Sequence, residues 1–308
     1  MGLIKSTIST LGILGGVYAG VSAALAANLT RLPEPYSETG KTTGQPVKFT
    51  ARGSDIQLSG QVFSSCEAVP KNRWILFNTG DIPFEVPEFR FNSLITDLTK
   101  SGFNVFQFDL RGRGRSSDSP STLGDYERLD LLGAIDYLEQ TQSEDLLLGL
   151  LGVDLGGVVS LLVGSNAQAI QAVVSDGAFA DLADHIESNR LGFRFANSFW
   201  MTGVKFWASR VHGIDISDVS PARHVARSET PVLVIHGAED SLVSPSHARH
   251  LGRAIGASFQ ELEKGEDFVW MVAGAEHGMS YSTAPDEYSS KVVKFFEAHL
   301  GAPQNEIS

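Results

Sequence analysis

The chain has 308 residues, of which 42% are hydrophobic and 19% are charged, so it has enough apolar material for the core of a large domain. Its formal net charge of −12 argues against nucleic acid as a partner, because phosphate binding needs a basic surface. The single cysteine, Cys66, excludes an internal disulfide and a cluster of thiolate metal ligands. No cofactor motif and no metal-ligand cluster occurs in the sequence, so we expect neither a cofactor nor a metal.

Residues 1–30 predict a membrane anchor or a signal segment. From Ser6 to Ala27 no residue is charged, and this segment is long enough to cross the hydrocarbon core of a bilayer as a helix. We expect a membrane-anchored protein in which residues 6–27 form an apolar helix that packs little against the rest of the chain. The stretch Ala24-Leu25-Ala26 resembles a signal-peptidase site, so secretion after cleavage is the alternative.

Small residues recur every fourth position in this predicted helix. Such spacing places them on one helix face, where a second helix can approach closely, and it would let two copies form a homodimer. These residues are Gly12, Gly16, Gly20 and Ala24.

Residues 31–46 are rich in proline, glycine and polar residues and predict a linker. Residues 47–303 then predict one α/β domain, in which apolar runs alternate with helical patterns that are clearest at 125–139 and 286–299. Nearly continuous apolar strands are typical of a mostly parallel sheet with helices on both faces. Eight strands are expected, the first two as an antiparallel hairpin: Val47–Thr50, Ile56–Phe63, Trp74–Phe77, Val105–Phe108, Leu146–Val153, Ala172–Val174, Val232–Ile235 and Phe268–Val272.

Residues 178–230 form an excursion that is too long for a simple crossover between strands. Its aromatic residues predict a helical lid over an apolar pocket for a small-molecule substrate. Phe199, Trp200 and Trp207 are the expected pocket residues. The same rings could instead pack the excursion onto the body of the domain.

The stretch Gly152-Val153-Asp154-Leu155-Gly156-Gly157 lies between an apolar strand and a helical run. It has the G-x-S-x-G pattern of a nucleophile elbow, with aspartate in the place of serine. The turn is sharp, so glycines are needed two residues to either side of Asp154. The backbone N–H of Leu155, with a second donor near Gly80, is expected to form an oxyanion hole.

An acid and a base follow the elbow in the expected order. Asp240 comes after the strand Val232–Ile235, and His277 comes after the strand Phe268–Val272. The order of nucleophile, acid and base is that of the α/β-hydrolases. We therefore predict a catalytic triad of Asp154, Asp240 and His277, with Asp176 as the rival acid.

Four stretches carry a family resemblance, and together they span most of the domain. They are Phe108–Ser116, the elbow, Phe179–Leu182 and Ile235–Asp240. With the last helix, these stretches resemble bacterial α/β-hydrolases of the Bem46-like and serine-aminopeptidase-like group, many of which carry an N-terminal membrane helix. The resemblance implies the α/β-hydrolase fold.

The chain departs from that pattern at three places. Asp154 replaces the serine, Asn78-Thr79 stands where the group usually has His-Gly, and Arg113 replaces a common histidine. The first two changes fall in the expected catalytic centre, so the serine-esterase or peptidase activity of the group does not carry over at Asp154.

A carboxylate nucleophile suits a saturated carbon with a leaving group, where it forms an alkyl ester that a His-activated water cleaves. Haloalkane dehalogenases and epoxide hydrolases of this fold use that scheme. Their elbow commonly reads Asp-Trp, whereas Leu155 follows here, and residues 178–230 lack the tyrosines of epoxide hydrolases. The alternatives are a ligand-binding pseudoenzyme, in which Asp154 holds His277 protonated, and a serine hydrolase altered at residue 154 by engineering.

Overall fold

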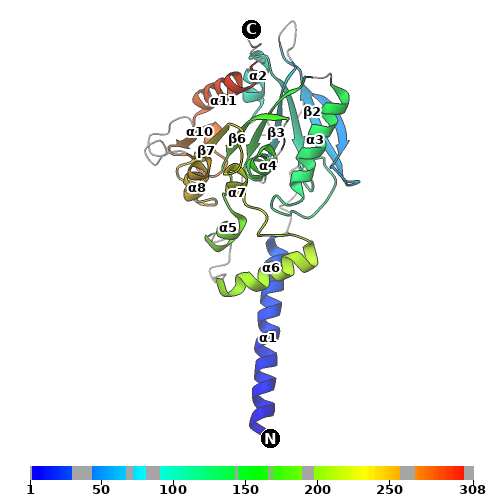
Figure 1. Ribbon diagram of the computed structural model, residues 1–308, viewed down its shortest axis with the longest axis vertical. Coiled ribbons are helices and arrows are strands. Elements are labelled where there is room, and N and C mark those ends of the chain that lie inside the picture. Colours follow the sequence, from blue (N-terminus) through cyan, green and yellow to red (C-terminus); the bar gives the residue numbers. More distant parts are fainter. Residues whose placement is uncertain are drawn as a thin grey trace.

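The computed structural model shows an α/β domain from which the helix α1 (Gly2–Leu29) extends as a long rod (Figure 1). It describes residues 2–29, 44–66, 72–80, 91–142, 145–165, 167, 169–188, 198–256 and 268–301. Within these ranges only the backbone is described at 2–13, 28–29, 188, 198–199 and 212. Most of the predicted linker 31–46 therefore lies outside the described residues.

The sheet has eight strands in the order β1-β2-β4-β3-β5-β6-β7-β8. β2 pairs antiparallel with β1 and with β4, and every other pairing is parallel, as predicted. The strands match the eight predicted segments and differ from them only at their ends. They are β1 (Gln45–Thr50), β2 (Gln57–Phe63), β3 (Arg73–Thr79), β4 (Asn104–Asp109), β5 (Leu147–Val153), β6 (Ile170–Asp176), β7 (Val232–Gly237) and β8 (Val269–Val272).

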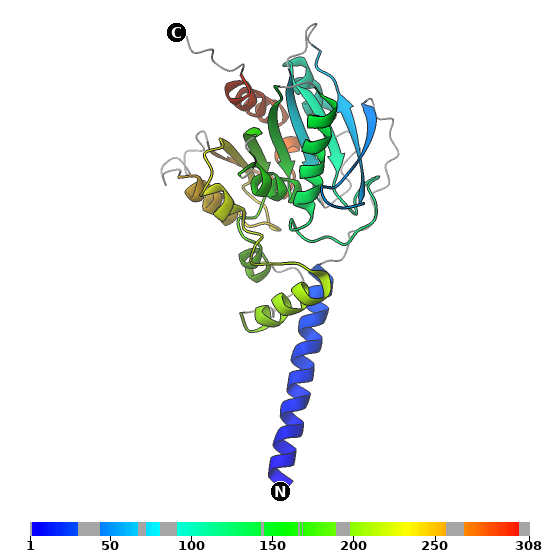
Figure 2. The ribbon, with the colours of Figure 1, turned by 45° about the vertical axis from the view of Figure 1, so that its right-hand side comes forward.

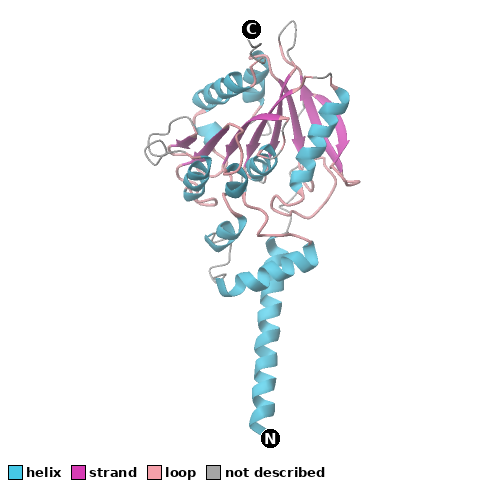
Figure 3. Cartoon of the chain, in the orientation of Figure 1, coloured by secondary structure: helices cyan, strands magenta, loops and turns pink. Residues whose placement is uncertain are grey.

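Helices cover both faces of the sheet (Figure 3). The first layer of helices packs its apolar side chains against one face of the sheet. It consists of α3 (Glu127–Thr141), α4 (Leu155–Gly164), α7 (Pro221–Val225) and α8 (Ser246–Ile255). The second layer packs on the opposite face and consists of α2 (Asn92–Lys100), α10 (Ser280–Thr283) and α11 (Pro285–His299). The α/β-hydrolase fold predicted from the sequence is confirmed.

Alternate side chains of one strand enter the two layers, as strand geometry requires. In β3, Trp74 and Leu76 join the core beneath the first layer, and Ile75 and Phe77 join the core beneath the second. All four are buried. Because both faces are covered, the strand has no polar alternation, and this explains the continuous apolar runs in the sequence.

The loop after β4 is fixed to α3 by buried charges. The Arg111 Nη2 atom lies 2.6 Å from Asp130 Oδ1, and both side chains are almost fully buried. Nearby, the buried Glu127 carboxylate accepts hydrogen bonds from the N–H groups of Thr122, at 2.8 Å, and Gly124, at 2.9 Å. Buried carboxylates are tolerated only when they are paired in this way, so these contacts specify the path of the loop.

The residues that follow β6 form the predicted helical excursion. α5 (Leu182–Ser188) and α6 (Ser198–His212) lie beyond the carboxyl ends of the strands, between the domain and the free part of α1 (Figures 1 and 2). α7 then returns the chain to the sheet. The excursion is thus placed on the edge of the sheet that carries Asp154.

One half of α1 packs on α6, so the expectation that residues 6–27 make little contact is wrong there. The Tyr18 ring stacks on Trp200 with the ring centroids 5.1 Å apart, and the Gly203 N–H donates to the Tyr18 hydroxyl at 2.9 Å. Ser22 and Ala26, one and two turns further along, are buried. No helix in the described part of the chain is long and apolar enough to span a membrane.

Candidate active site

Asp154 occupies a sharp turn between β5 and α4. Its backbone has φ 57° and ψ −123°, a strained conformation for a residue with a side chain. A Cβ atom at Gly152 would collide with the Gly156 carbonyl, and a Cβ atom at Gly156 would collide with the Asn78 carbonyl. Glycine is therefore required on both sides, as predicted for the elbow. The turn leaves the Asp154 side chain 18% exposed at the edge of the sheet.

His277 and Asp240 lie next to the elbow. The Nε2 atom of His277 is 3.1 Å from Asp154 Oδ1, and its Nδ1 atom is 2.7 Å from Asp240 Oδ2. The side chains of His277 and Asp240 are buried. The structure thus brings the three predicted catalytic residues into one hydrogen-bonded chain of carboxylate, imidazole and carboxylate.

The Asp240 carboxylate is held by several donors. Its Oδ1 atom accepts the N–H groups of Leu242, at 2.9 Å, and Val243, at 2.8 Å. On the other oxygen, Oδ2, His236 Nε2 lies 3.3 Å away, beside His277. Burial alone would raise the pKa of Asp240, but the hydrogen bonds from both histidines outweigh it and hold the pKa well below its usual range. Asp240 therefore stays ionised and orients the imidazole.

His277 carries a proton in the free protein. Burial alone would lower its pKa, because the charged form loses hydration. The hydrogen bonds and negative charges of Asp154 and Asp240 outweigh burial and raise the pKa of His277 to about 10. An imidazolium between two carboxylates cannot take a proton, so His277 is not a base while Asp154 is ionised.

Asp176, the rival acid, has a different environment. It is fully buried at the end of β6, and its Oδ1 atom accepts the hydroxyl of Ser280 at 2.8 Å. Burial raises the pKa of Asp176 to about 6. The backbone carbonyl of Asp176 accepts the Asp154 N–H at 2.8 Å. Asp176 therefore supports the elbow, while the hydrogen bond from His277 goes to Asp240.

One of the two backbone donors predicted for an oxyanion hole is engaged elsewhere. The Leu155 N–H lies in the first turn of α4, where backbone amides have no partner within the helix. The Gly80 N–H donates instead to the Val153 carbonyl at 2.8 Å and extends the pairing of β3 with β5. The second donor expected at Gly80 is thus engaged in the sheet, and residues 81–90 lie outside the described residues.

Asn78, one of the departures from the resembled pattern, is fully buried at the end of β3. It packs against the elbow from the side of α4, because a Cβ atom at Gly156 would also collide with its Oδ1 atom. As far as the structure describes the chain, neither polar atom of the Asn78 side chain has a hydrogen-bond partner. Such a group is costly to bury, and nothing in the described part of the chain explains why it is there.

His185 in α5 is close to the triad, and the sequence analysis did not identify it. Its pKa is lowered to about 4, chiefly by burial, and the charges of Asp154, Asp240 and His277 also act on it. The ring stacks on Phe179 with the centroids 4.9 Å apart. His185 is therefore a neutral imidazole beside the triad. The one sequence signal that could have indicated this was its place in the excursion, because α5 begins shortly after the carboxyl end of β6.

Two of the three aromatic residues predicted to line the pocket make ring contacts with α1 and within α6. Trp200 stacks on Tyr18 of α1, and Trp207 packs edge-on against Phe206 with the ring centroids 5.5 Å apart. The side chain of Phe199 is outside the described residues. The Trp200 ring therefore joins α6 to α1, whereas Trp207 contacts a ring of its own helix and the core of the domain, and the pocket role of these residues stays a prediction.

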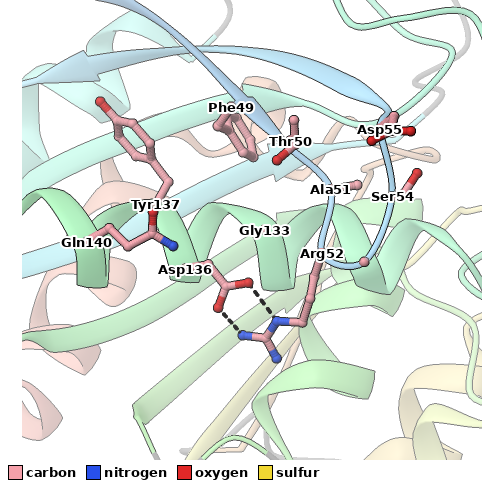
Figure 4. A pocket seen from close by; sticks show the side chains of 11 residues that line it. Phe49, Thr50, Ala51, Arg52, Ser54, Asp55, Gly133, Asp136, Tyr137 and Gln140 are labelled. Carbon is pink, nitrogen blue, oxygen red and sulfur yellow. Dashed lines mark hydrogen bonds and ion pairs between the residues drawn. The ribbon is translucent and has the colours of Figure 1, made fainter.

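A pocket of about 500 Å³ lies elsewhere, between the β1–β2 turn and α3 (Figure 4). Arg52 and Asp136 form an ion pair across it, and no triad residue lines it. Among the described residues, no group of three or more histidine, cysteine or acidic side chains is placed to hold a metal ion.

Residues 88–303 match the prolyl oligopeptidase family, Peptidase_S9, and the match includes the whole triad. The chain belongs to the prolyl oligopeptidase family. In this family member an aspartate occupies the elbow, and the finer resemblance to the Bem46-like group stays a prediction.

Among curated proteins, the chain is 26% identical to the uncharacterized Bacillus subtilis protein YqkD over 217 residues, which cover 68% of the chain and 66% of YqkD. It thus spans just under two thirds of that relative. It is 26% identical to the uncharacterized protein YfhR of Escherichia coli K12 over 282 residues, covering 89% and 85% of the two chains. Identity to the acylamino-acid-releasing enzyme of Rattus norvegicus is 24%, over 67% of the chain and 28% of that enzyme.

Two solved structures show the same fold. A Pyrococcus furiosus esterase has a TM-score of 0.65 at 20% identity and covers 88% of this chain and 99% of its own. The acylaminoacyl peptidase of Pyrococcus horikoshii has a TM-score of 0.61 at 16% identity, over 86% of this chain and 43% of its own. The protein therefore has the α/β-hydrolase fold and belongs to a family of hydrolases.

Proposed function

We propose that the protein is a hydrolase in which Asp154 attacks a saturated carbon atom and forms a covalent alkyl ester. One observation carries this proposal: the Asp154 carboxylate is partly exposed at the nucleophile position and lies 3.1 Å from His277 Nε2. A carboxylate attacking an ester or amide gives an anhydride, which reverts easily. Attack on a saturated carbon gives a stable ester once the leaving group has gone.

In the first step one Asp154 oxygen bonds to the substrate carbon. The bond between that carbon and the leaving group breaks, and the leaving group departs with the electron pair. No proton is transferred, so the protonated state of His277 does not hinder the step.

Alkylation then converts His277 into a base. The ester at Asp154 is neutral, so one of the two negative charges that raise the pKa of His277 is lost. The pKa falls, and the imidazolium releases its proton to solvent. Asp240 remains ionised and keeps the ring oriented.

In the second step His277 takes a proton from water, and the hydroxide attacks the ester carbonyl carbon of Asp154. The bond between that carbon and the alkoxy oxygen breaks, and His277 returns the proton to the departing alcohol. Asp154 is left as a carboxylic acid and passes its proton to His277, which restores the ion pair. The sum is substrate plus water to alcohol, leaving-group anion and one proton.

The proposed substrate is a small apolar molecule whose leaving group is stable as an anion, such as a halide. An opening epoxide needs a proton on its oxygen, and residues 178–230 contain no tyrosine to supply one. A halide needs only stabilisation of negative charge. The Leu155 N–H at the positive end of the α4 dipole supports that role.

A second candidate is a pseudoenzyme that binds a ligand through the same site. The ion pair of Asp154 with His277 favours it, since it holds the imidazole protonated. The engagement of the Gly80 N–H also leaves this chain without one expected oxyanion donor. In this alternative Asp154 replaces the nucleophile without taking its role.

A substrate screen separates the two candidates. The protein, Asp154→Asn and Asp154→Ser are assayed on short haloalkanes, epoxides and p-nitrophenyl esters. The proposal predicts halide release by the protein and none by Asp154→Asn, which keeps the shape of the side chain without its charge. Haloalkane and epoxide turnover absent from the protein, with ester hydrolysis gained in Asp154→Ser, favours the pseudoenzyme.

A further inference from the structure

The exposed apolar side chains are concentrated on α1 and α6. Seven large hydrophobic side chains are exposed among the described residues, and five of them belong to these two helices. They are Leu14, Val17 and Val21 on α1 and Phe206 and Val211 on α6. Phe206 is 59% exposed, although phenylalanine is among the residue types most often buried in folded proteins. Such a concentration marks an interaction surface.

The faces of α6 are clearly divided. Met201, Val204 and Ala208 are buried and join the core of the domain. Phe206 and Thr202, one turn apart, are exposed on the other side of the helix. The exposed face therefore points away from the domain.

α1 and α6 form one unit. A Cβ atom at Gly203 would collide with the Ser22 hydroxyl, so only glycine lets the two helices approach this closely. The Tyr18 contacts with Trp200 and Gly203 fix the same crossing. Figures 1 and 2 show that α1 continues past α6 on the side opposite the domain.

The charge of this unit is opposite to that of the whole protein. α6 contains Lys205 and Arg210 and no acidic residue, and α1 contains Lys5 and no acidic residue. The whole chain has a formal net charge of −12. A basic helix with exposed aromatic and aliphatic side chains is typical of helices that lie on anionic membranes.

We propose that α6 lies on the surface of a bilayer that contains anionic phospholipid. Phe206 enters the acyl region, Lys205 and Arg210 lie at the headgroups, and the free part of α1 points into the bilayer. The excursion over Asp154 is thereby held at the membrane, where apolar molecules accumulate. Binding at this surface does not depend on the reaction at Asp154, so each can fail without the other.

Tryptophan fluorescence tests the position of α6 directly. Two of the four tryptophans, Trp200 and Trp207, are in α6, whereas Trp74 and Trp270 are buried in the sheet. The full chain carrying Trp74→Phe and Trp270→Phe is mixed with phosphatidylcholine–phosphatidylserine vesicles whose acyl chains are brominated. We expect quenching, and none in the reciprocal Trp200→Phe, Trp207→Phe protein. Vesicle binding without quenching of the α6 tryptophans would overturn the proposal, because α1 alone would then hold the protein.

Vesicle flotation with surface variants tests the named residues. Loss of each cationic side chain is expected to weaken binding about fivefold, so Lys205→Glu with Arg210→Glu should weaken it strongly. Phe206→Ser should also weaken it. The matched controls are Arg249→Glu with Arg253→Glu on α8 and Phe268→Ser, which should bind as the unchanged protein does. Unaltered binding of the α6 variants, or a solution dimer that Phe206→Ser dissociates, would show that lipid does not cover this face.

Discussion

The Nε2 atom of His277 lies 3.1 Å from the Oδ1 atom of Asp154, within hydrogen-bonding distance. The group that the imidazole faces at the nucleophile position is thus a carboxylate and not a serine hydroxyl. Together with Asp240 this contact encloses the imidazole between two negative charges. The resting site is therefore an ion pair. It becomes competent for base catalysis only when the charge on Asp154 is removed, and alkylation of Asp154 would remove it.

The first prediction is a shift of the His277 titration. In the unchanged protein the ring should titrate with a pKa of about 10. Asp154→Asn removes one negative charge, so the pKa of His277 should fall by more than one unit, an estimate from the usual effect of a nearby charge. NMR of the imidazole protons across the pH range measures this. Asp176→Asn is the control, and an equal fall in that variant would mean that Asp154 is not the cause.

A second prediction concerns stability at alkaline pH. Because the pKa of His277 is raised from 6.5 to about 10, the folded protein binds more protons than the unfolded chain between these values. The free energy of unfolding should therefore be highest, as far as His277 contributes, below pH 6.5 and should fall as pH rises toward 10. Urea unfolding at a series of pH values measures it. Asp154→Asn should have a smaller slope, and identical slopes would contradict the ion pair.

A third prediction compares two ion pairs on one helix. Asp130→Ala leaves the buried Arg111 guanidinium unpaired and should lower the free energy of unfolding by about 3–5 kcal/mol. Asp136→Ala breaks an ion pair with Arg52 in which both side chains are partly exposed to solvent, and should cost about 1 kcal/mol or less. Urea unfolding of both variants checks the difference. Equal losses would mean that burial is not what distinguishes the two pairs.

The sheet and the triad were accessible from the sequence because each depends on local pattern. Both-face burial makes β3 and its neighbours continuous apolar runs, and the carboxyl ends of parallel strands meet at one edge of the sheet. Because Asp154, Asp240 and His277 each follow such a strand, the sequence predicted that they lie close together. Their distances and the protonation of His277 required the three-dimensional contacts.

The environment of the excursion could not be read in the same way. An aromatic side chain in a helix packs equally well on a pocket or on another helix, so the sequence did not distinguish a pocket role for Trp200 from its stacking on Tyr18. The Gly80 N–H is engaged because β3 continues in register with β5, and no residue type signals where a strand pairing ends. His185 joined the site only through the fold.

A fourth prediction identifies the acid that orients His277. Asp240→Asn replaces the buried carboxylate that holds Nδ1 and should lower kcat on any productive substrate by about 10³–10⁴-fold. Asp176→Asn keeps an acceptor for Ser280 and should lower kcat far less. Steady-state kinetics of both variants measure this. A larger loss in Asp176→Asn would reverse the assignment of the acid.

Detection of a covalent adduct on Asp154 is the most direct test of the proposed mechanism. His277→Gln and the unchanged protein are incubated with a short haloalkane, and the peptide that contains residues 152–157 is weighed by mass spectrometry. Alkylation does not need a base but hydrolysis of the ester does, so the account predicts an alkyl adduct that accumulates in His277→Gln. The double variant with Asp154→Asn should carry none. A His277→Gln protein that stays unmodified while the unchanged protein releases halide would contradict the account, because the reaction would then proceed without an ester on Asp154.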